Sequence, residues 1–296
     1  MQEVHDALYP FRLNHAGVRG GVVRLHSAWA EIGARGDHPG EVLGLLGQAL
    51  TASALFAGML KFEGSLSIHL RNAGALRLLF AECTHDGQLR GIARMKDADG
   101  QRGVDLGDAQ AQLAITIENA KAQTRYQGLV EVESGPLSNA FERYFERSEQ
   151  LPTRIVLAVG EGVCAGIFVQ KIADDSQDGQ PADADAWNRT GHLLATLSHA
   201  ELLELPVETL LLRLFHDEGV VLQPGKPLRF QCRCSRDRVL KMMRALGAAE
   251  ATAALDDQGR ASVTCEFCDR SYEVDRVDIA ALFAGAPQAP DSLTPH

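Results

Sequence analysis

The C-terminal fold of this 296-residue chain is decided by Gln231-Cys232-Arg233-Cys234 and Cys265-Glu266-Phe267-Cys268, with thirty residues between the two cysteine motifs. A C-x-C and a C-x-x-C separated by a helical insert build a tetrahedral zinc site with four cysteine ligands, because each close pair supplies two thiolates. Apolar residues at helical spacing predict that insert: Val239, Met242, Met243 and Leu246. We therefore expect one Zn²⁺ per chain, bound by Cys232, Cys234, Cys265 and Cys268.

The region that carries these motifs, residues 228–284, contains too few apolar residues for an independent core. Metal binding at such a site contributes an apparent free energy of about 10–16 kcal/mol, which would compensate for the weak core. We expect a small zinc-binding domain over 228–284 and a tail of low structure over 285–296.

The residues alone leave three interpretations of the zinc site open. The ion could be purely structural, as in many zinc sites built from four cysteines. A zinc ribbon that regulates by binding nucleic acid is suggested by basic residues near the first pair, but nine basic residues meet nine acidic ones between 229 and 283, and the chain carries a net charge of −10. A redox switch is favoured by the C-x-C spacing, because cysteines one residue apart form a small, strained disulfide that is easily reduced again. Oxidants also attack thiolates, the form that zinc holds.

The sequence gives no support to an enzyme active site. It has no Gly-rich phosphate loop, nucleophile elbow or H-E-x-x-H motif. Thioredoxin-like catalysis is disfavoured because the C-x-x-C does not follow a strand inside a βαβ unit. The remaining cysteines, Cys83 and Cys164, lie in apolar β-type runs, where buried and inert thiols are expected.

Residues 1–173 are expected to form an α+β domain with a mostly antiparallel sheet, because short strands with hairpin turns predominate over regular β-α-β alternation. Helices are predicted at 138–148, with Ser138 as N-cap, and at 42–60. The second is long enough to cross a membrane, but its glycines and polar residues favour a buried core helix. Residues 1–13 lack a secretory signal, so we expect a cytoplasmic protein. The predicted strands are 65–70, 76–81, 89–94, 113–117, 126–132, 154–159 and 165–172.

Residues 174–227 are expected to link the two domains. Between 174 and 186 there are five aspartates and no basic residue, which predicts an exposed, mobile segment. Helices follow: Ser198-His199-Ala200-Glu201 fits a capping box, and Pro206 suits the first turn of a helix that ends near Phe215. Fourteen of the twenty-three residues from 193 to 215 are apolar, so these helices need a partner surface.

Taken together, the motifs resemble the bacterial heat shock protein 33 family of redox-regulated holdase chaperones. The cysteine pattern matches, and the resemblance covers essentially the whole chain. It departs at Asp269, where the family often has glycine after the second pair. Three other stretches match the family: Tyr126-Gln127-Gly128; Tyr144-Phe145 followed by Ser148-Glu149-Gln150-Leu151-Pro152-Thr153; and Leu205-Pro206 followed by Arg213-Leu214-Phe215-His216.

The resemblance implies a cytosolic, ATP-independent chaperone that is folded and inactive while Zn²⁺ is bound to the reduced thiolates. Oxidation would join Cys232 to Cys234 and Cys265 to Cys268, release the metal, unfold the C-terminal module and loosen the linker. The active form would be a homodimer that binds unfolded client proteins, with no membrane or nucleic-acid partner and no enzymatic activity. The candidate client-binding residues of the linker are Leu193, Leu197, Leu202, Leu211, Leu214 and Phe215.

Overall fold

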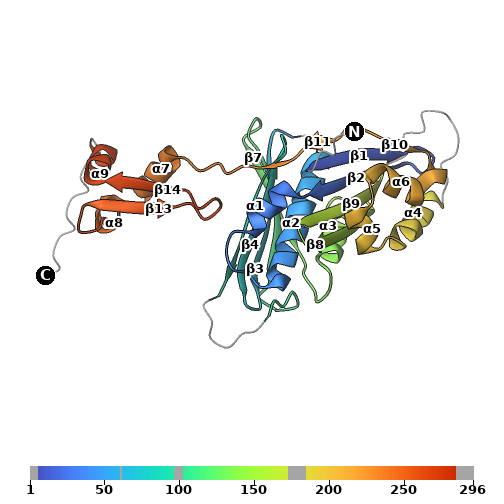
Figure 1. Ribbon diagram of the computed structural model, residues 1–296, viewed down its shortest axis with the longest axis horizontal. Helices are drawn as coiled ribbons and strands as arrows, with labels where there is room; N and C mark the ends of the chain where they lie inside the picture. The colour runs from blue at the N-terminus through green and yellow to red at the C-terminus, as the bar shows by residue number, and fades with distance from the viewer. Residues whose placement is uncertain (1–5, 61, 97–102, 173–184, 285–296) are drawn as a thin grey trace. The chain divides into compact units, whose positions relative to one another are not determined.

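The computed structural model describes residues 6–60, 62–96, 103–172 and 185–284 (Figure 1). The described residues form two compact units, of which the first ends at Gln231 and the second begins at Cys232. Both combine helices with predominantly antiparallel sheets, which confirms the α+β fold class. Most of the acidic segment, up to residue 184, and the tail from residue 285 lie outside the described residues.

One sheet of the first unit has the strand order β10-β1-β2-β9-β8, with β11 also pairing with β1. The predicted strands at 154–159 and 165–172 are β8 and β9. Strands β1 and β2 were not predicted, because Pro10, Gly20 and Gly21 interrupt the alternation of apolar residues in them. The strands are β1 (Ala7–Leu13), β2 (Val18–Leu25), β8 (Thr153–Gly160), β9 (Val163–Lys171), β10 (Val220–Leu222) and β11 (Lys226–Pro227).

The second sheet of this unit has the order β12-β5-β4-β3-β6-β7. The five strands predicted at 65–70, 76–81, 89–94, 113–117 and 126–132 are confirmed as β3 to β7, with ends shifted by a few residues. Neighbouring strands pair antiparallel, except that β12 runs parallel to β5. The strands are β3 (Gly64–Ala73), β4 (Leu76–Thr84), β5 (Gln88–Met95), β6 (Gln112–Asn119), β7 (Thr124–Val130) and β12 (Arg229–Phe230).

Helix α2 (Gly40–Met59) lies between the two sheets (Figure 1) and supplies much of their shared core. It is long and apolar enough to cross a membrane, but 72% of its apolar window is buried inside the protein, as predicted for a core helix. Two further helices complete this layer, α1 (Ser27–Gly33) and α3 (Leu137–Ser148). The prediction that Ser138 caps α3 is wrong, because the helix begins one residue earlier and its N-cap is Pro136.

Three helices cover the opposite face of the first sheet, and we call them the linker helices: α4 (Ala186–Ala195), α5 (His199–Glu204) and α6 (Val207–Phe215). Strand β9 contributes side chains to both faces of the first sheet, one covered by the linker helices and the other by α2. Its residues Ala165, Ile167 and Val169 pack with the linker helices, whereas Cys164 and Phe168 belong to the core around α2. A continuous apolar run is typical of a strand that is buried on both faces.

The segment after α6 stays with the first unit beyond residue 228, where we had expected the zinc domain to begin. A short 3-10 helix, η1 (His216–Glu218), leads into β10 and β11 along the edge of β1. Leu228 is buried in the core around α2, and β12 extends the second sheet. These backbone pairs hold the chain as far as Gln231, whose N–H donates to the Leu89 carbonyl at 2.9 Å.

Up to residue 284, where the described part of the second unit ends, it consists of one hairpin and three short helices: α7 (Arg236–Leu246), α8 (Ala248–Ala253), β13 (Arg260–Thr264), β14 (Ser271–Asp275) and α9 (Arg276–Phe283). Its buried apolar residues are Val239, Met243, Ala251, Ala261, Val274 and Ile279. So small a core rarely stabilises a domain of this size without a cross-link or a metal.

Candidate functional site

The four cysteines of the two motifs come together at one end of the second unit. Cys232 and Cys234 lie on the chain that enters α7, where Ser235 caps the helix by accepting the Arg238 N–H. Cys265 and Cys268 lie in the turn between β13 and β14. The predicted helical insert between the two motifs is therefore present, and all four cysteine side chains are half-buried.

The distances between the sulfur atoms fit a tetrahedral metal site. The four Sγ atoms all lie within 4.8 Å of one another, with 3.5 Å between Cys232 and Cys265 and 3.4 Å between Cys234 and Cys268. Zinc–sulfur bonds of about 2.3 Å place sulfurs about 3.8 Å apart in a tetrahedron. All four cysteines are free thiols in this arrangement. The donor set therefore fits Zn²⁺, bound by two sulfurs from each motif.

The turn that carries the second pair keeps its shape despite the aspartate at position 269. Asp269 has φ of 56°, in the left-handed region that favours glycine, and its N–H donates to the Cys265 carbonyl at 2.8 Å. Aspartate tolerates this conformation better than most residues. The departure from the family pattern therefore leaves the ligand turn intact.

The thiols differ in how readily they lose a proton. Burial raises the pKa of Cys232 to about 12, and it also raises the pKa of Cys268. Burial acts in the same direction on Cys234, but hydrogen bonds from the Tyr272 hydroxyl, at 3.0 Å, and from the neighbouring thiols outweigh it and lower the pKa of Cys234 to about 7. Of these three thiols, Cys234 ionises at the lowest pH.

The candidate client-binding residues lie in the layer formed by the linker helices. Five are buried there, namely Leu197, Leu202, Leu211, Leu214 and Phe215, and Leu193 packs at its margin. Phe215 stacks on Phe11 of β1, with ring centroids 6.2 Å apart. In this conformation the residues are covered, so any role in binding another protein requires the helices to move.

Polar contacts that the sequence did not indicate also hold the linker helices. Arg24 of β2 donates to the carbonyl oxygens of Leu202 at 2.8 Å and Leu205 at 2.6 Å, at the C-terminal end of α5. Arg189 of α4 forms a bidentate ion pair with Glu218, whose side chain is almost fully buried. The capping box of Ser198 and Glu201 is confirmed. Helical spacing on α6 could have predicted that Leu210 is also buried in this layer. No local sequence pattern predicts the contacts of Arg24 with α5.

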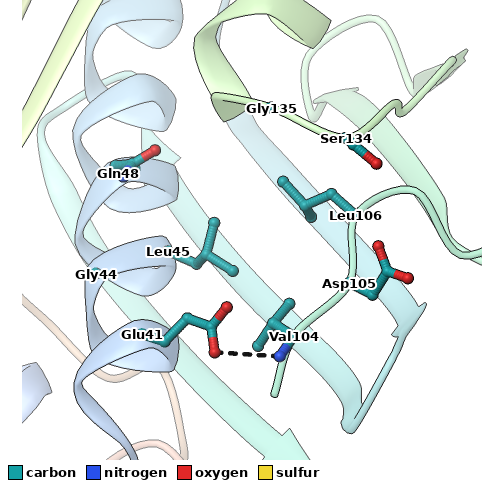
Figure 2. Close-up of a pocket in the computed structure, with 9 residues that line it drawn as sticks. All are labelled: Glu41, Gly44, Leu45, Gln48, Val104, Asp105, Leu106, Ser134 and Gly135. Carbon is teal, nitrogen blue, oxygen red and sulfur yellow. Dashed lines mark hydrogen bonds between the residues drawn. The ribbon is translucent and has the colours of Figure 1, made fainter.

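A surface pocket of about 500 Å³ lies in the first unit beside α2 (Figure 2). Its lining includes carboxylates but no histidine, cysteine or lysine, and Glu41 already accepts the Val104 N–H at 3.1 Å. The other two cysteines, Cys83 and Cys164, are buried as predicted, and burial raises the pKa of both, for Cys83 to about 12.

Comparisons with known proteins agree with this combination of fold and site. The model of the family described as Hsp33 protein matches residues 6–275. A 33 kDa chaperonin from Nitrosococcus oceani is 40% identical over 98% of this chain and 99% of its own length, and one from Ectopseudomonas mendocina is 40% identical over 99% and 100%. The crystal structure of the 33 kDa chaperonin (heat shock protein 33 homologue) from Thermotoga maritima matches with a TM-score of 0.77, covering 95% of this chain and 98% of that one, at 20% identity.

An α+β unit followed by a small four-cysteine unit thus defines a two-unit protein with a candidate zinc centre. The chain belongs to the Hsp33 family. Its relatives in that family carry the name chaperonin, and the more distant crystal structure shows the shared fold.

Proposed function

We propose that this chain is a redox-regulated, ATP-independent molecular chaperone of the holdase type, which acts in the cytoplasm and catalyses no reaction. Relatives named 33 kDa chaperonin support the chaperone activity. The observation that carries the regulation is the cluster of four free thiols in a unit with a very small apolar core.

In the reduced protein, the thiolates of Cys232, Cys234, Cys265 and Cys268 hold one Zn²⁺. The ion supplies a cross-link between the chain that enters α7 and the hairpin of β13 and β14. The six buried apolar residues of this unit are too few to replace that cross-link. Folding of the second unit therefore depends on the sulfurs remaining thiolates.

Oxidation by a peroxide or hypochlorite removes the ligand set. Cys232 joins Cys234 and Cys265 joins Cys268, and each new S–S bond transfers two electrons from the two sulfurs to the oxidant. Sulfurs in these disulfides no longer bind the metal, so the second unit unfolds. The loss of that folded neighbour in the chain loosens the linker helices, which open locally and expose their apolar layer to unfolded client proteins.

A homodimer is the active form in this proposal. Strand β7 ends the second sheet in the described strand order, so one of its edges has no strand beside it there. Tyr126 and Leu129 of β7 are exposed, the latter by 76%. An edge strand with exposed apolar side chains is suited to pairing with a second copy.

An aggregation assay separates this function from that of a nucleic-acid-binding zinc ribbon. We expect the peroxide-oxidised, zinc-free protein to suppress light scattering by an unrelated protein diluted from denaturant, at near-stoichiometric amounts and without nucleotide. The reduced, zinc-loaded protein should suppress it at least several-fold less. If neither form suppresses scattering and the reduced form binds RNA or DNA with a steep salt dependence, the zinc-ribbon function is correct instead.

A further inference from the structure

Tyr272 links the two cysteine motifs through a hydrogen bond. Its hydroxyl donates to Cys234 Sγ at 3.0 Å. Tyr272 lies in β14, paired with Val263 of β13, so the hairpin that carries the second pair of cysteines also contacts a sulfur of the first pair. The tyrosine ring is half-buried and packs against the small core of the second unit. The ring thus has a fixed place from which its hydroxyl reaches Cys234.

The other sulfur contacts of hydrogen-bond length in the cluster join one thiol to another, between Cys232 and Cys265 and between Cys234 and Cys268. These sulfurs are themselves the candidate metal ligands. The Tyr272 hydroxyl differs from them because it donates to Cys234 from outside the ligand set, and a single substitution removes it.

A hydrogen bond to a thiolate has two chemical effects. It fixes the direction of the sulfur lone pairs, and the loss of such outer partners typically weakens metal binding by 10–100-fold. It also withdraws electron density from the sulfur, which lowers its nucleophilicity. The same hydroxyl therefore favours metal binding and opposes oxidation.

We propose that Tyr272 is a positioning residue of the cysteine cluster, whose hydroxyl orients Cys234 for metal binding and slows the attack of its sulfur on peroxide. In that attack, the Cys234 thiolate bonds to one peroxide oxygen, the O–O bond breaks and hydroxide leaves, which gives a sulfenic acid. A second cysteine thiolate then attacks the sulfenic sulfur, and a second hydroxide leaves as the disulfide forms. This inference rests on the proposed redox function, because it assigns a residue that sets the sensitivity of the same site.

The substitution Tyr272→Phe tests the proposal because it removes the hydroxyl and keeps the ring. We expect zinc affinity, measured by competition with a chromogenic chelator, to fall at least 10-fold. In zinc-loaded protein, where the metal keeps the Cys234 sulfur a thiolate in both variants, alkylation followed by mass spectrometry should show Cys234 oxidised several-fold faster by peroxide. In protein loaded with Co²⁺, the thiolate-to-cobalt charge-transfer band should shift. The matched control is Ser271→Ala, which removes a hydroxyl from the same hairpin and breaks its 2.9 Å hydrogen bond to Thr264.

Unchanged zinc affinity, Cys234 oxidation rate and cobalt spectrum in Tyr272→Phe, or the same changes in Ser271→Ala, would overturn the proposal. If Tyr272→Phe does not fold, 3-fluorotyrosine at position 272 provides the test, since it keeps the ring and is a stronger donor. In zinc-loaded protein, Cys234 should then oxidise more slowly than in the wild type, and an equal or faster rate overturns the proposal. These readouts are independent of chaperone activity, so a wild type that lacks holdase activity refutes the proposed function without affecting the hydrogen-bond effect.

Discussion

The substitution Cys265→Ser is expected to abolish tight zinc binding and to unfold the second unit while the first unit stays folded. Serine removes one of the four sulfurs that lie within 4.8 Å of one another, and three remaining ligands hold the ion far less tightly. The apparent binding energy at stake is about 10–16 kcal/mol, which the six buried apolar residues do not replace. Chelator competition measures the zinc affinity, and hydrogen exchange across α7 to α9 measures the unfolding.

The matched control for this variant is Cys83→Ala. Cys83 is buried in the core around α2 and lies outside the cluster, so its loss should leave zinc affinity and the exchange of the second unit unchanged. Wild-type zinc affinity in single serine variants of all four cluster cysteines would show that these residues are not the metal ligands.

The substitution Leu211→Asp is expected to release the linker helices in reduced, zinc-loaded protein. Leu211 is fully buried between α6 and the first sheet. Truncating a buried leucine costs about 2–5 kcal/mol, and burying an unpaired charge costs more. The helices are short, and α5 is held at its C-terminal end by the two hydrogen bonds from Arg24, so local opening should relieve the misfit. Suppression of client aggregation without any oxidant is the readout.

The neighbouring residue provides a matched control. Leu212 lies on the same helix but is 57% exposed, so Leu212→Asp should leave both the docking of the helices and the inactivity of the reduced protein unchanged. A Leu211→Asp protein that shows faster exchange across α4 to α6 but no chaperone activity would separate linker opening from client binding. That result would remove these helices from the mechanism.

The chemistry of the site could be predicted from the sequence because it depends on short-range spacing. The C-x-C, the C-x-x-C and the helical insert fix which four sulfurs meet, and the structure brings all four together. The capping box at Ser198 could also be predicted from the sequence, because its two hydrogen bonds join residues three positions apart. The high apolar content of residues 193–215 also predicted correctly that these helices lie against a surface.

Features that depend on distant parts of the chain could not be predicted in this way. Nothing near Arg24 indicates that its side chain bonds to carbonyl groups 178 and 181 residues away. Strand β1 pairs with β2, and β2 pairs with β9, so these strands are stabilised by distant partners and by two helical layers rather than by their own pattern. The N-cap of α3 was misplaced by two residues, because it is Pro136 rather than Ser138, and a serine at the second helical position gives the same local signal as a serine cap.

Hydrogen exchange of the linker helices in the wild-type protein, before and after peroxide, tests whether oxidation of the cysteine cluster opens these helices. We expect amides of residues 186–215 to be protected in the reduced, zinc-loaded form and to lose most of that protection when the four cluster thiols are oxidised. Strands β3 and β4, within the core around α2, should exchange equally slowly in both forms and serve as the internal reference. Equal protection of residues 186–215 in the two forms, with zinc released and the thiols oxidised, would show that the linker helices do not transmit the redox signal.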